Sequence, residues 1–218
     1  MAVGHAERLL PMIDEVMRRS GVAFADLGAI AVTVGPGTFT GVRTGIAAAR
    51  GLALAAGLPV LGMTSLALIA RRADAVIAEL TCGSRLAVCM DAGKGQIYAQ
   101  LFGGPASIDV RSRADHFGPD HFSIDSAPIS EPMLATAGDV AAMLAAGRSI
   151  VVGSAATVVA TLATGLGSDV RVGSGPGQAS AQDMLGARLQ MLSPVRPLYL
   201  RQPDAVASPD QALPRALS

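Results

Sequence analysis

The sequence has no tryptophan, and only two tyrosines and five phenylalanines occur among its 218 residues. Half of the residues are nevertheless hydrophobic, and Ala, Val and Leu, together with many glycines, dominate the chain. We therefore expect a core of closely packed small side chains instead of large aromatic anchors. The length allows a substantial core, in one large domain or two small ones.

The chain also lacks an excess of either charge, since 17 Lys and Arg residues balance 17 Asp and Glu residues. Direct binding of nucleic acid calls for a basic surface or a basic stripe with stacking aromatic side chains. Neither is visible here, so any role in nucleic-acid biochemistry is expected to be indirect.

Cysteine is scarce as well, and Cys82 and Cys89 are too far apart for a metal-type CxxC pair. Cys89 lies in an apolar, strand-like run, where we expect a buried reduced thiol. No signal-peptide pattern is visible at the start of the sequence, and these features together predict a cytoplasmic protein.

Residues 149–168 carry no charge and are long enough to span a bilayer. Glycines and several Ser and Thr residues interrupt this run. A buried strand followed by a short helix is therefore the favoured interpretation, and no membrane association is expected.

Apolar strands and amphipathic helices alternate in the first part of the chain, which is typical of parallel α/β architecture. The second part begins with an expected β-hairpin over 85–102, followed by a long irregular excursion over 103–132. The early elements are a helix over 5–20 ending at Gly21, strands at 29–34 and 59–64, and helices over 40–56 and 65–79. The later ones are helices over 138–146, 155–163 and 178–191, with strands at 150–152 and 197–200.

The segment "AVTVGPGTFTGVRTGIAAARGLALAAGLPV" at 31–60 reads as strand, glycine turn and helix. It has no lysine for a P-loop, and its glycine spacing and lack of a following acid exclude the dinucleotide fingerprint. A generic anion-binding turn at Gly35, Gly37 and Thr38 remains, with Thr38 or Thr40 as the helix N-cap.

Along the following helix, small residues recur at every fourth position and form a smooth ridge, namely Gly41, Gly45, Ala49, Ala53 and Gly57. Glycine inside a helix costs about 0.5–1 kcal/mol relative to alanine, so the glycines require a packing reason. The ridge can pack on the chain's own sheet, or one face can meet the sheet and another a partner helix. The near absence of charge favours the second interpretation.

Five stretches in order resemble the TsaB (YeaZ) family, an accessory subunit of bacterial tRNA threonylcarbamoyladenosine (t6A) synthesis. They are "GHAERLLPMIDEVM", "VTVGPGTFTGVRTGIAAARGLAL", "LPVLGMTSLALIA", "MDAGKGQIYAQLF" and "PLYLRQPDA". The resemblance implies a two-lobed actin-like ATPase fold of the sugar kinase, heat-shock ATPase and actin superfamily. We expect a first lobe over 1–80 and a second lobe over 81–218, with a loosely ordered tail from about 203.

The same resemblance implies a catalytically silent scaffold that pairs with TsaD, the threonylcarbamoyltransferase acting on adenosine 37 of tRNA. The ATPase TsaE would join that pair, a homodimer can form through similar surfaces, and tRNA would be contacted only indirectly. The partner helices correspond to 5–19 and 40–56. Their expected interface residues are Leu9, Leu10, Ile13, Met17, Gly41, Val42, Thr44, Gly45, Ala48, Ala49 and Leu52.

TsaD carries a His-x-x-x-His metal motif where this chain reads Met63-Thr64-Ser65-Leu66-Ala67. No imidazole or carboxylate is present there, so no metal, catalytic residue or cofactor is predicted. A nucleotide at a subunit junction is compatible with the family but is not predicted. His116 and His121 lie in the irregular excursion, far in sequence from His5.

Two departures from the family pattern stand out. Members begin with strands that would precede the helix at 5–20, and we expect these first-lobe strands to be missing through a mis-assigned start. The looser turn at 91–95, with Gly93 in place of a bulky residue, leaves any interlobe contact there in question.

The main alternative is an actin-fold ATPase or kinase that acts on a small substrate through the turn at 35–38 and Asp91. A metalloprotease, the activity suggested by older family names, is disfavoured because metal ligands are lacking. For the scaffold hypothesis, we expect Gly45→Leu to abolish the heterodimer by steric blocking.

Overall fold

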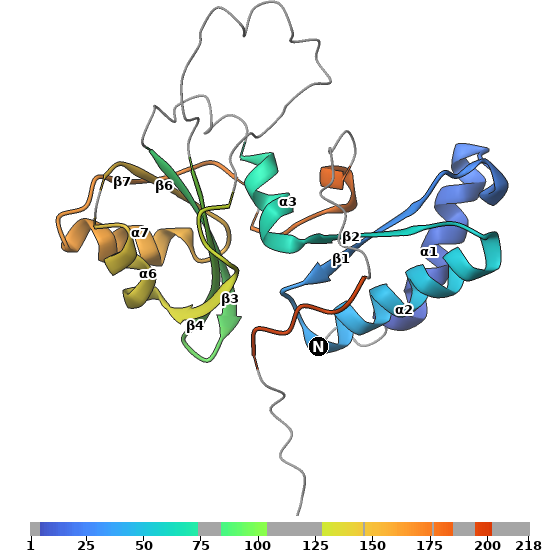
Figure 1. Cartoon of the computed structure of the whole chain (residues 1–218), viewed down its shortest axis with the longest axis horizontal. Coiled ribbons are helices and arrows are strands. Elements are labelled where there is room, and N and C mark those ends of the chain that lie inside the picture. The colour runs from blue at the N-terminus through green and yellow to red at the C-terminus, as the bar shows by residue number, and fades with distance from the viewer. Residues whose placement is uncertain are drawn as a thin grey trace, which may run out of the picture.

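The computed structural model describes residues 5–73, 84–103, 128–145, 147–175, 177–184 and 195–201. These residues form two lobes, with the early, blue part of the chain in one and residues 85–172, from green to light orange, in the other, while the red segment returns to the first lobe (Figure 1). The two-lobed α/β arrangement agrees with the actin-like ATPase fold expected from the sequence.

In its described part, the first lobe is built on two parallel strands with helices packed beside them (Figure 1). Ile30 pairs with Val60 in this sheet, and the register shifts between Thr33 and Gly35, where the strand gives way to the glycine turn. The elements are α1 (His5–Ser20), a short 3-10 turn (Phe24–Asp26), β1 (Ile30–Gly35), α2 (Phe39–Ala56) and β2 (Val60–Thr64).

Helix α2 begins and ends where its sequence signals predict. The Thr38 hydroxyl accepts a hydrogen bond from the Gly41 N–H at 3.3 Å, so Thr38, and not Thr40, is the N-cap. At the other end, Gly57 has φ of 67°, a left-handed conformation that glycine adopts without strain.

The second lobe contains a mixed sheet of five described strands in the order β5-β4-β3-β6-β7. The expected hairpin is present, because β3 pairs antiparallel with β4, while β6 pairs parallel with β3 on the other side. The elements are β3 (Arg85–Gly93), β4 (Gln96–Gly103), β5 (Met133–Thr136), α6 (Ala137–Met143), β6 (Ser149–Val152), α7 (Ala156–Gly165) and β7 (Val170–Val172).

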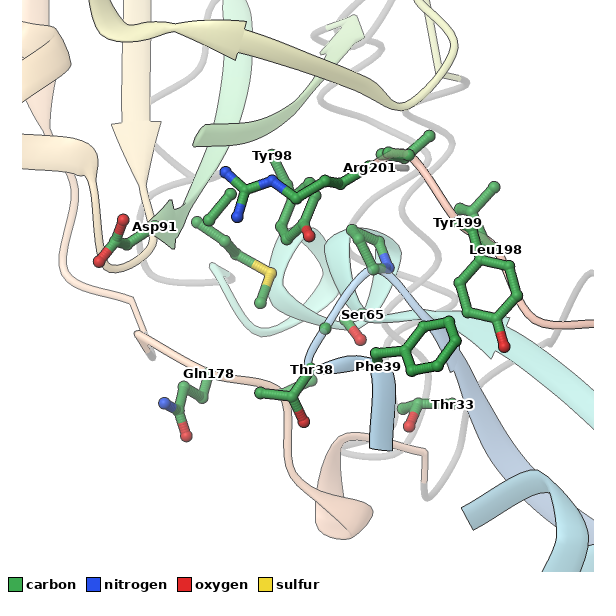
Figure 2. Close-up of a pocket in the computed structure, with 16 residues that line it drawn as sticks. Thr33, Thr38, Phe39, Ser65, Asp91, Tyr98, Gln178, Leu198, Tyr199 and Arg201 are labelled. Carbon is green, nitrogen blue, oxygen red and sulfur yellow. The ribbon is translucent and has the colours of Figure 1, made fainter. Parts of the chain in front are cut away.

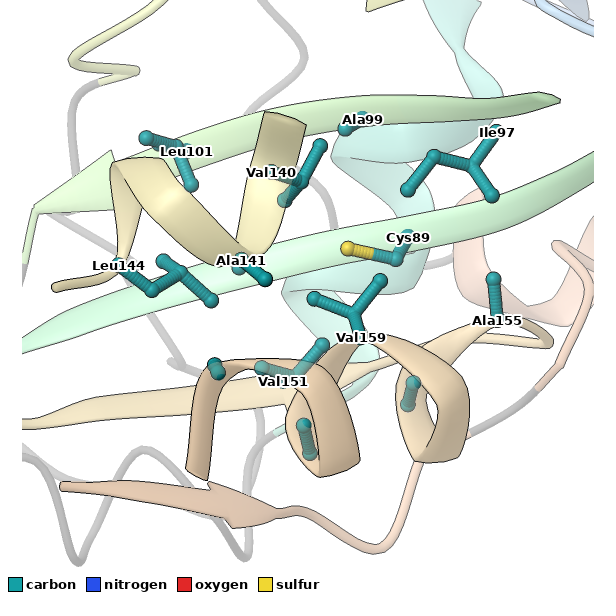
Figure 3. Packing of buried hydrophobic residues seen from close by; sticks show 14 residues of the cluster. Cys89, Ile97, Ala99, Leu101, Val140, Ala141, Leu144, Val151, Ala155 and Val159 are labelled. Carbon is teal, nitrogen blue, oxygen red and sulfur yellow. The ribbon is translucent and has the colours of Figure 1, made fainter. Parts of the chain in front are cut away.

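Helices cover both faces of this sheet. Helices α6 and α7 pack on one face and enclose Cys89, which lies between Val140 and Val159 (Figure 3). Burial raises the pKa of the Cys89 thiol to about 12, as expected for an inert core cysteine. Helix α3 (Ser65–Arg72) packs on the opposite face through Leu66 and Ile69.

Gly153 allows the turn after β6 to close over β3. Its φ is +103°, and a Cβ atom there would lie 2.3 Å from the Cys89 carbonyl oxygen. The same oxygen accepts a hydrogen bond from the Ala155 N–H at 3.0 Å. Only glycine satisfies both the dihedral angle and this close approach.

Several sequence expectations need correction or lie outside the described residues. Residues 197–200 do not form a strand, because Pro197 has no N–H and the segment follows β1 only through Leu198. The helix expected over 178–191 is a 3-10 turn at Ala181–Met184 in its described part. Cys82, His116, His121, most of the 103–132 excursion and the tail from 203 lie outside the described residues, as do the ends of the helices expected to reach 79 and 191.

The uncharged run at 149–168 forms β6, α7 and the turn after it, as the interrupted sequence predicted. In the part of the chain that the structure describes, no helix is long and apolar enough to cross a membrane.

Candidate functional site

A cavity of about 690 Å³ lies between the two lobes (Figure 2). The first lobe contributes the glycine turn, including Gly37 and Thr38, and the second lobe contributes Asp91 and Tyr98. A third wall comes from residues 198–201, which belong to the segment 195–201 that we call the strap. We call this cavity the cleft.

The predicted anion-binding turn lies at the cleft, although the Thr38 hydroxyl already accepts a hydrogen bond within α2. Gly37 and Thr38 line the cavity, and the Thr38 hydroxyl already caps α2. Gly35 has φ of +102°, and a Cβ atom there would lie 3.0 Å from the Leu198 carbonyl oxygen. Gly35 therefore serves the close approach of the strap to the turn.

Asp91 lines the cleft near the end of β3, and its carboxylate and N–H both make hydrogen bonds within the second lobe. Its carboxylate accepts a hydrogen bond from the Gly93 N–H at 2.8 Å, and its own N–H donates to the Ser154 hydroxyl at 2.9 Å. Among the described residues, no cluster of His, Cys, Asp and Glu side chains could hold a metal ion.

The position that corresponds to the TsaD metal motif is occupied by a helix start. The Thr64 hydroxyl accepts a hydrogen bond from the Ala67 N–H at 3.1 Å and caps α3. Ser65, the next residue, lines the cleft. The segment therefore supplies the N-cap of α3 and one hydroxyl group at the wall of the cleft.

The strap is held against α2 by an aromatic and cationic cluster. The Arg43 guanidinium lies 3.7 Å from the centroid of the Phe39 ring, and its Nε–H donates to the Tyr199 hydroxyl at 2.8 Å. Arg50 donates to the Val195 carbonyl. Helix α2 has no other charged residue. Both of its charged side chains therefore donate hydrogen bonds to the strap.

The second candidate surface is the apolar arc of α1. Leu9, Ile13 and Met17 are half-buried, whereas Leu10 is 54% exposed and Val16 is 63% exposed. Helix α1 contacts α2, yet this contact leaves much of the arc open to solvent. Sequence analysis identified four of these residues and omitted Val16.

The α2 residues expected to face a partner are divided among several environments. Val42 and Ala49 are buried in the chain's own core, which removes them from any surface that a partner could touch. A Cβ atom on Gly45 would lie 3.7 Å from Cγ2 of Val32, so Gly45 faces β1. Gly41 is exposed, and Thr44, Ala48 and Leu52 are half-buried.

Two α2 residues that the sequence analysis missed are more accessible. Leu54 is 87% exposed, and nothing lies within 4 Å of the position that a Cβ atom on Gly51 would occupy. On a helical wheel Gly51 lies about 140° and Leu54 about 80° from Ile46, so both fall outside the buried stripe of Val42, Ile46, Ala49 and Ala53. A helical wheel centred on that buried side would have found them. We define the helical face as Leu10 and Val16 of α1 with Gly51 and Leu54 of α2.

Comparison with known proteins identifies the family. The model of the family described as "TsaD: tRNA N6-adenosine threonylcarbamoyltransferase" matches residues 1–128, more than half of the chain. The chain belongs to the TsaD family. Within this family it falls in the TsaB (YeaZ) group, as the sequence resemblance indicated.

Two curated relatives illustrate the similarity to the TsaD family. The chain is 39% identical over 94 residues to the tRNA threonylcarbamoyladenosine biosynthesis protein TsaB of Escherichia coli, covering 43% of this chain and 39% of that protein. It is 50% identical over 76 residues to a tRNA N6-adenosine threonylcarbamoyltransferase of Erythrobacter litoralis, covering 34% and 22%. The matches thus span two-fifths or less of these relatives.

A solved structure from Pseudomonas aeruginosa, described as an uncharacterized protein with similarity to peptidase YEAZ, covers more of the chain. It superposes with a TM-score of 0.65 at 25% identity, over 90% of this chain and 84% of that one. The similarity therefore extends over both lobes.

Proposed function

We propose that the chain is a non-catalytic subunit of t6A biosynthesis that docks TsaD through the helical face. The names of the TsaB relatives support the pathway. The observation that carries the docking role is the exposure of large apolar side chains on α1 and α2. Apolar side chains that gather on one surface commonly mark an interaction site.

The chemistry of the face fits a helix-to-helix contact. Arg43 and Arg50 are turned to the strap, which leaves no free charge of α2 to be desolvated by a partner. Gly51 lacks any internal neighbour that would explain a glycine inside a helix. Close approach of a second backbone supplies that explanation, because small residues allow helices to pack tightly.

Catalytic silence is part of the proposal. Thr64 uses its hydroxyl as a helix cap where TsaD has its metal motif, and the Asp91 carboxylate is engaged by its own turn. The residues at these two positions therefore perform structural tasks. We assign no cofactor to the chain.

The remaining assignments follow from the same proposal. TsaE would bind the TsaD pair, the helical face can also form a homodimer, and the balanced charge of the chain favours indirect contact with tRNA. We place the protein in the cytoplasm, with the partner helices in a first lobe over 1–80 and a second lobe over 81–218.

Reconstitution of t6A formation tests the proposal. Purified chain, TsaD, TsaE, a threonylcarbamoyl donor and an unmodified tRNA transcript are combined, and t6A is measured by mass spectrometry of nucleosides. We expect modification with the full mixture and its loss when either this chain or TsaD is omitted. Equal t6A formation without this chain would contradict the proposal.

An actin-fold ATPase or kinase is the second candidate, because Thr38 and Asp91 line one cleft. It requires nucleotide hydrolysis by the isolated chain that is lost in Asp91→Asn. The scaffold proposal requires no hydrolysis above the blank. A phosphate-release assay on the two purified proteins separates these functions.

A further inference from the structure

The strap contacts both lobes and passes along the cleft. Leu198, Tyr199, Leu200 and Arg201 all line the cavity (Figure 2). Helix α3 also contacts both lobes, since it packs against β1 and β2 as well as β3 and β4. The relative position of the lobes therefore depends on the strap as well as on α3.

The strap is firmly attached to the first lobe. Val195 is 5% exposed and packs with Val34 and Ile46 in the small first-lobe core. The Leu198 N–H donates to the Val34 carbonyl oxygen at 2.8 Å. With Arg50 bonded to Val195 and Arg43 bonded to Tyr199, the attachment combines apolar burial, a backbone hydrogen bond and two charged donors.

The attachment to the second lobe is smaller: Leu200 packs half-buried against the core shared by α3 and the second-lobe sheet, and Arg201 makes the hydrogen bonds. One terminal nitrogen of this guanidinium donates to the Gly93 carbonyl oxygen at 2.9 Å and to Oε1 of Gln96 at 2.6 Å. Both acceptors belong to the β3–β4 hairpin. The looser turn at Gly93 therefore makes an interlobe contact after all, through its backbone.

We propose that the strap is a latch that sets the opening of the cleft, with Arg201 as its releasable end. The asymmetry of the two attachments carries this inference. The first-lobe end rests on several cooperating contacts, whereas the second-lobe end rests on one half-buried leucine, Leu200, and on hydrogen bonds from Arg201 that water can replace. When Arg201 leaves the hairpin, the strap stays on the first lobe and the cleft widens about α3.

Distance measurements between the lobes test the latch. Spin labels are placed on the exposed positions Ala55→Cys of α2 and Ala142→Cys of α6, with the natural cysteines replaced by alanine, and pulsed electron resonance gives the distance distribution. We expect Arg201→Ala to shift this distribution to longer and broader distances. Arg201→Lys should shift it less, because the ammonium group can still donate to one acceptor.

Arg196→Ala is the matched control, since Arg196 is an exposed arginine of the strap that forms no hydrogen bond or ion pair with another described residue. An unchanged distribution in Arg201→Ala, or an equal change in Arg196→Ala, would overturn the proposal. If Arg201→Ala does not fold, Gln96→Ala removes one acceptor and must give a smaller shift in the same direction. No shift in Gln96→Ala would then overturn it.

Hydrogen exchange identifies which end is released. The Leu198 amide should remain protected in Arg201→Ala, because its bond to Val34 is retained. An increase in its exchange of about tenfold or more would mean that the whole strap detaches. That result would overturn the assignment of Arg201 as the releasable end.

Discussion

Shortening the exposed leucines of the helical face should weaken pairing with TsaD and leave the free protein intact. Leu54→Ala and Leu10→Ala are the two changes that we consider. Leu54 is 87% exposed and Leu10 is 54% exposed in the free chain. Neither substitution opens a large internal cavity, so each should alter the free energy of unfolding of the isolated chain by at most about 1 kcal/mol.

The exposed fractions set the expected loss of binding. A leucine-to-alanine change removes three carbon groups, each worth about 0.8 kcal/mol when buried. If TsaD covers the exposed fraction of each leucine side chain, the free energy of binding falls by about 2 kcal/mol for Leu54→Ala and by about 1.3 kcal/mol for Leu10→Ala. At about 1.4 kcal/mol for each tenfold change, Kd should rise about 30-fold and about 9-fold, respectively.

Isothermal titration of TsaD with each variant measures these ratios. Leu166→Ala is the control, because Leu166 is 61% exposed and directly follows α7, a helix that lies away from α1 and α2 (Figure 1). Its Kd should equal that of the wild type. Values within twofold of the wild type for both Leu54→Ala and Leu10→Ala would refute the docking assignment.

Three further predictions concern the fold. Gly153→Ala should lower the free energy of unfolding in chemical denaturation by roughly 3 kcal/mol or more, while Gly167→Ala, which has positive φ but open space, should lower it by only about 1 kcal/mol. In a variant lacking the other cysteine, Cys89 should react with a thiol reagent at pH 8 only on unfolding, since burial raises its pKa to about 12; fast reaction in the folded state would contradict this. Hydrogen bonds from the Thr136 hydroxyl and backbone lower the pKa of Asp139 below 3.8, so its stabilising contribution should be present above that pH and be lost as the pH falls. The melting temperatures of wild type and Asp139→Asn should accordingly converge in acid, and a constant difference would argue against the cap.

Local signals in the sequence were sufficient for most of the helices and strands, although β5 and β7 were not predicted and the helix expected over 178–191 is a 3-10 turn in its described part. The cap at Thr38, the left-handed stop at Gly57 and the apolar alternation around the β3–β4 turn are each encoded within a few residues. Strand, turn and helix therefore appeared where expected. The element at 197–200 failed because a strand requires a neighbour with free hydrogen-bonding groups, which an apolar run does not guarantee.

The candidate site was harder to predict because its contacts join distant parts of the chain. The partners of Arg43 and Arg50 lie 156 and 145 positions away, where no local pattern points to them. The glycine ridge was ambiguous for a related reason, since a four-residue repeat does not reveal which side meets the chain's own sheet. The structure turns Gly45 inward and leaves Gly51 open.

This distinction changes the substitution that tests docking. Gly45→Leu would disturb packing against Val32, so lost pairing could reflect a damaged fold. Gly51→Leu places the same side chain in open space on α2. Leucine is also the better helix former, so the isolated chain should be as stable as the wild type or more stable by up to about 1 kcal/mol.

The dissociation constant of Gly51→Leu for TsaD therefore tests the central claim most directly. We predict that Kd rises at least about tenfold, because the leucine prevents close approach of the partner helix, while the melting temperature of the free variant does not fall. An unchanged Kd in this folded variant would show that TsaD does not dock on the helical face.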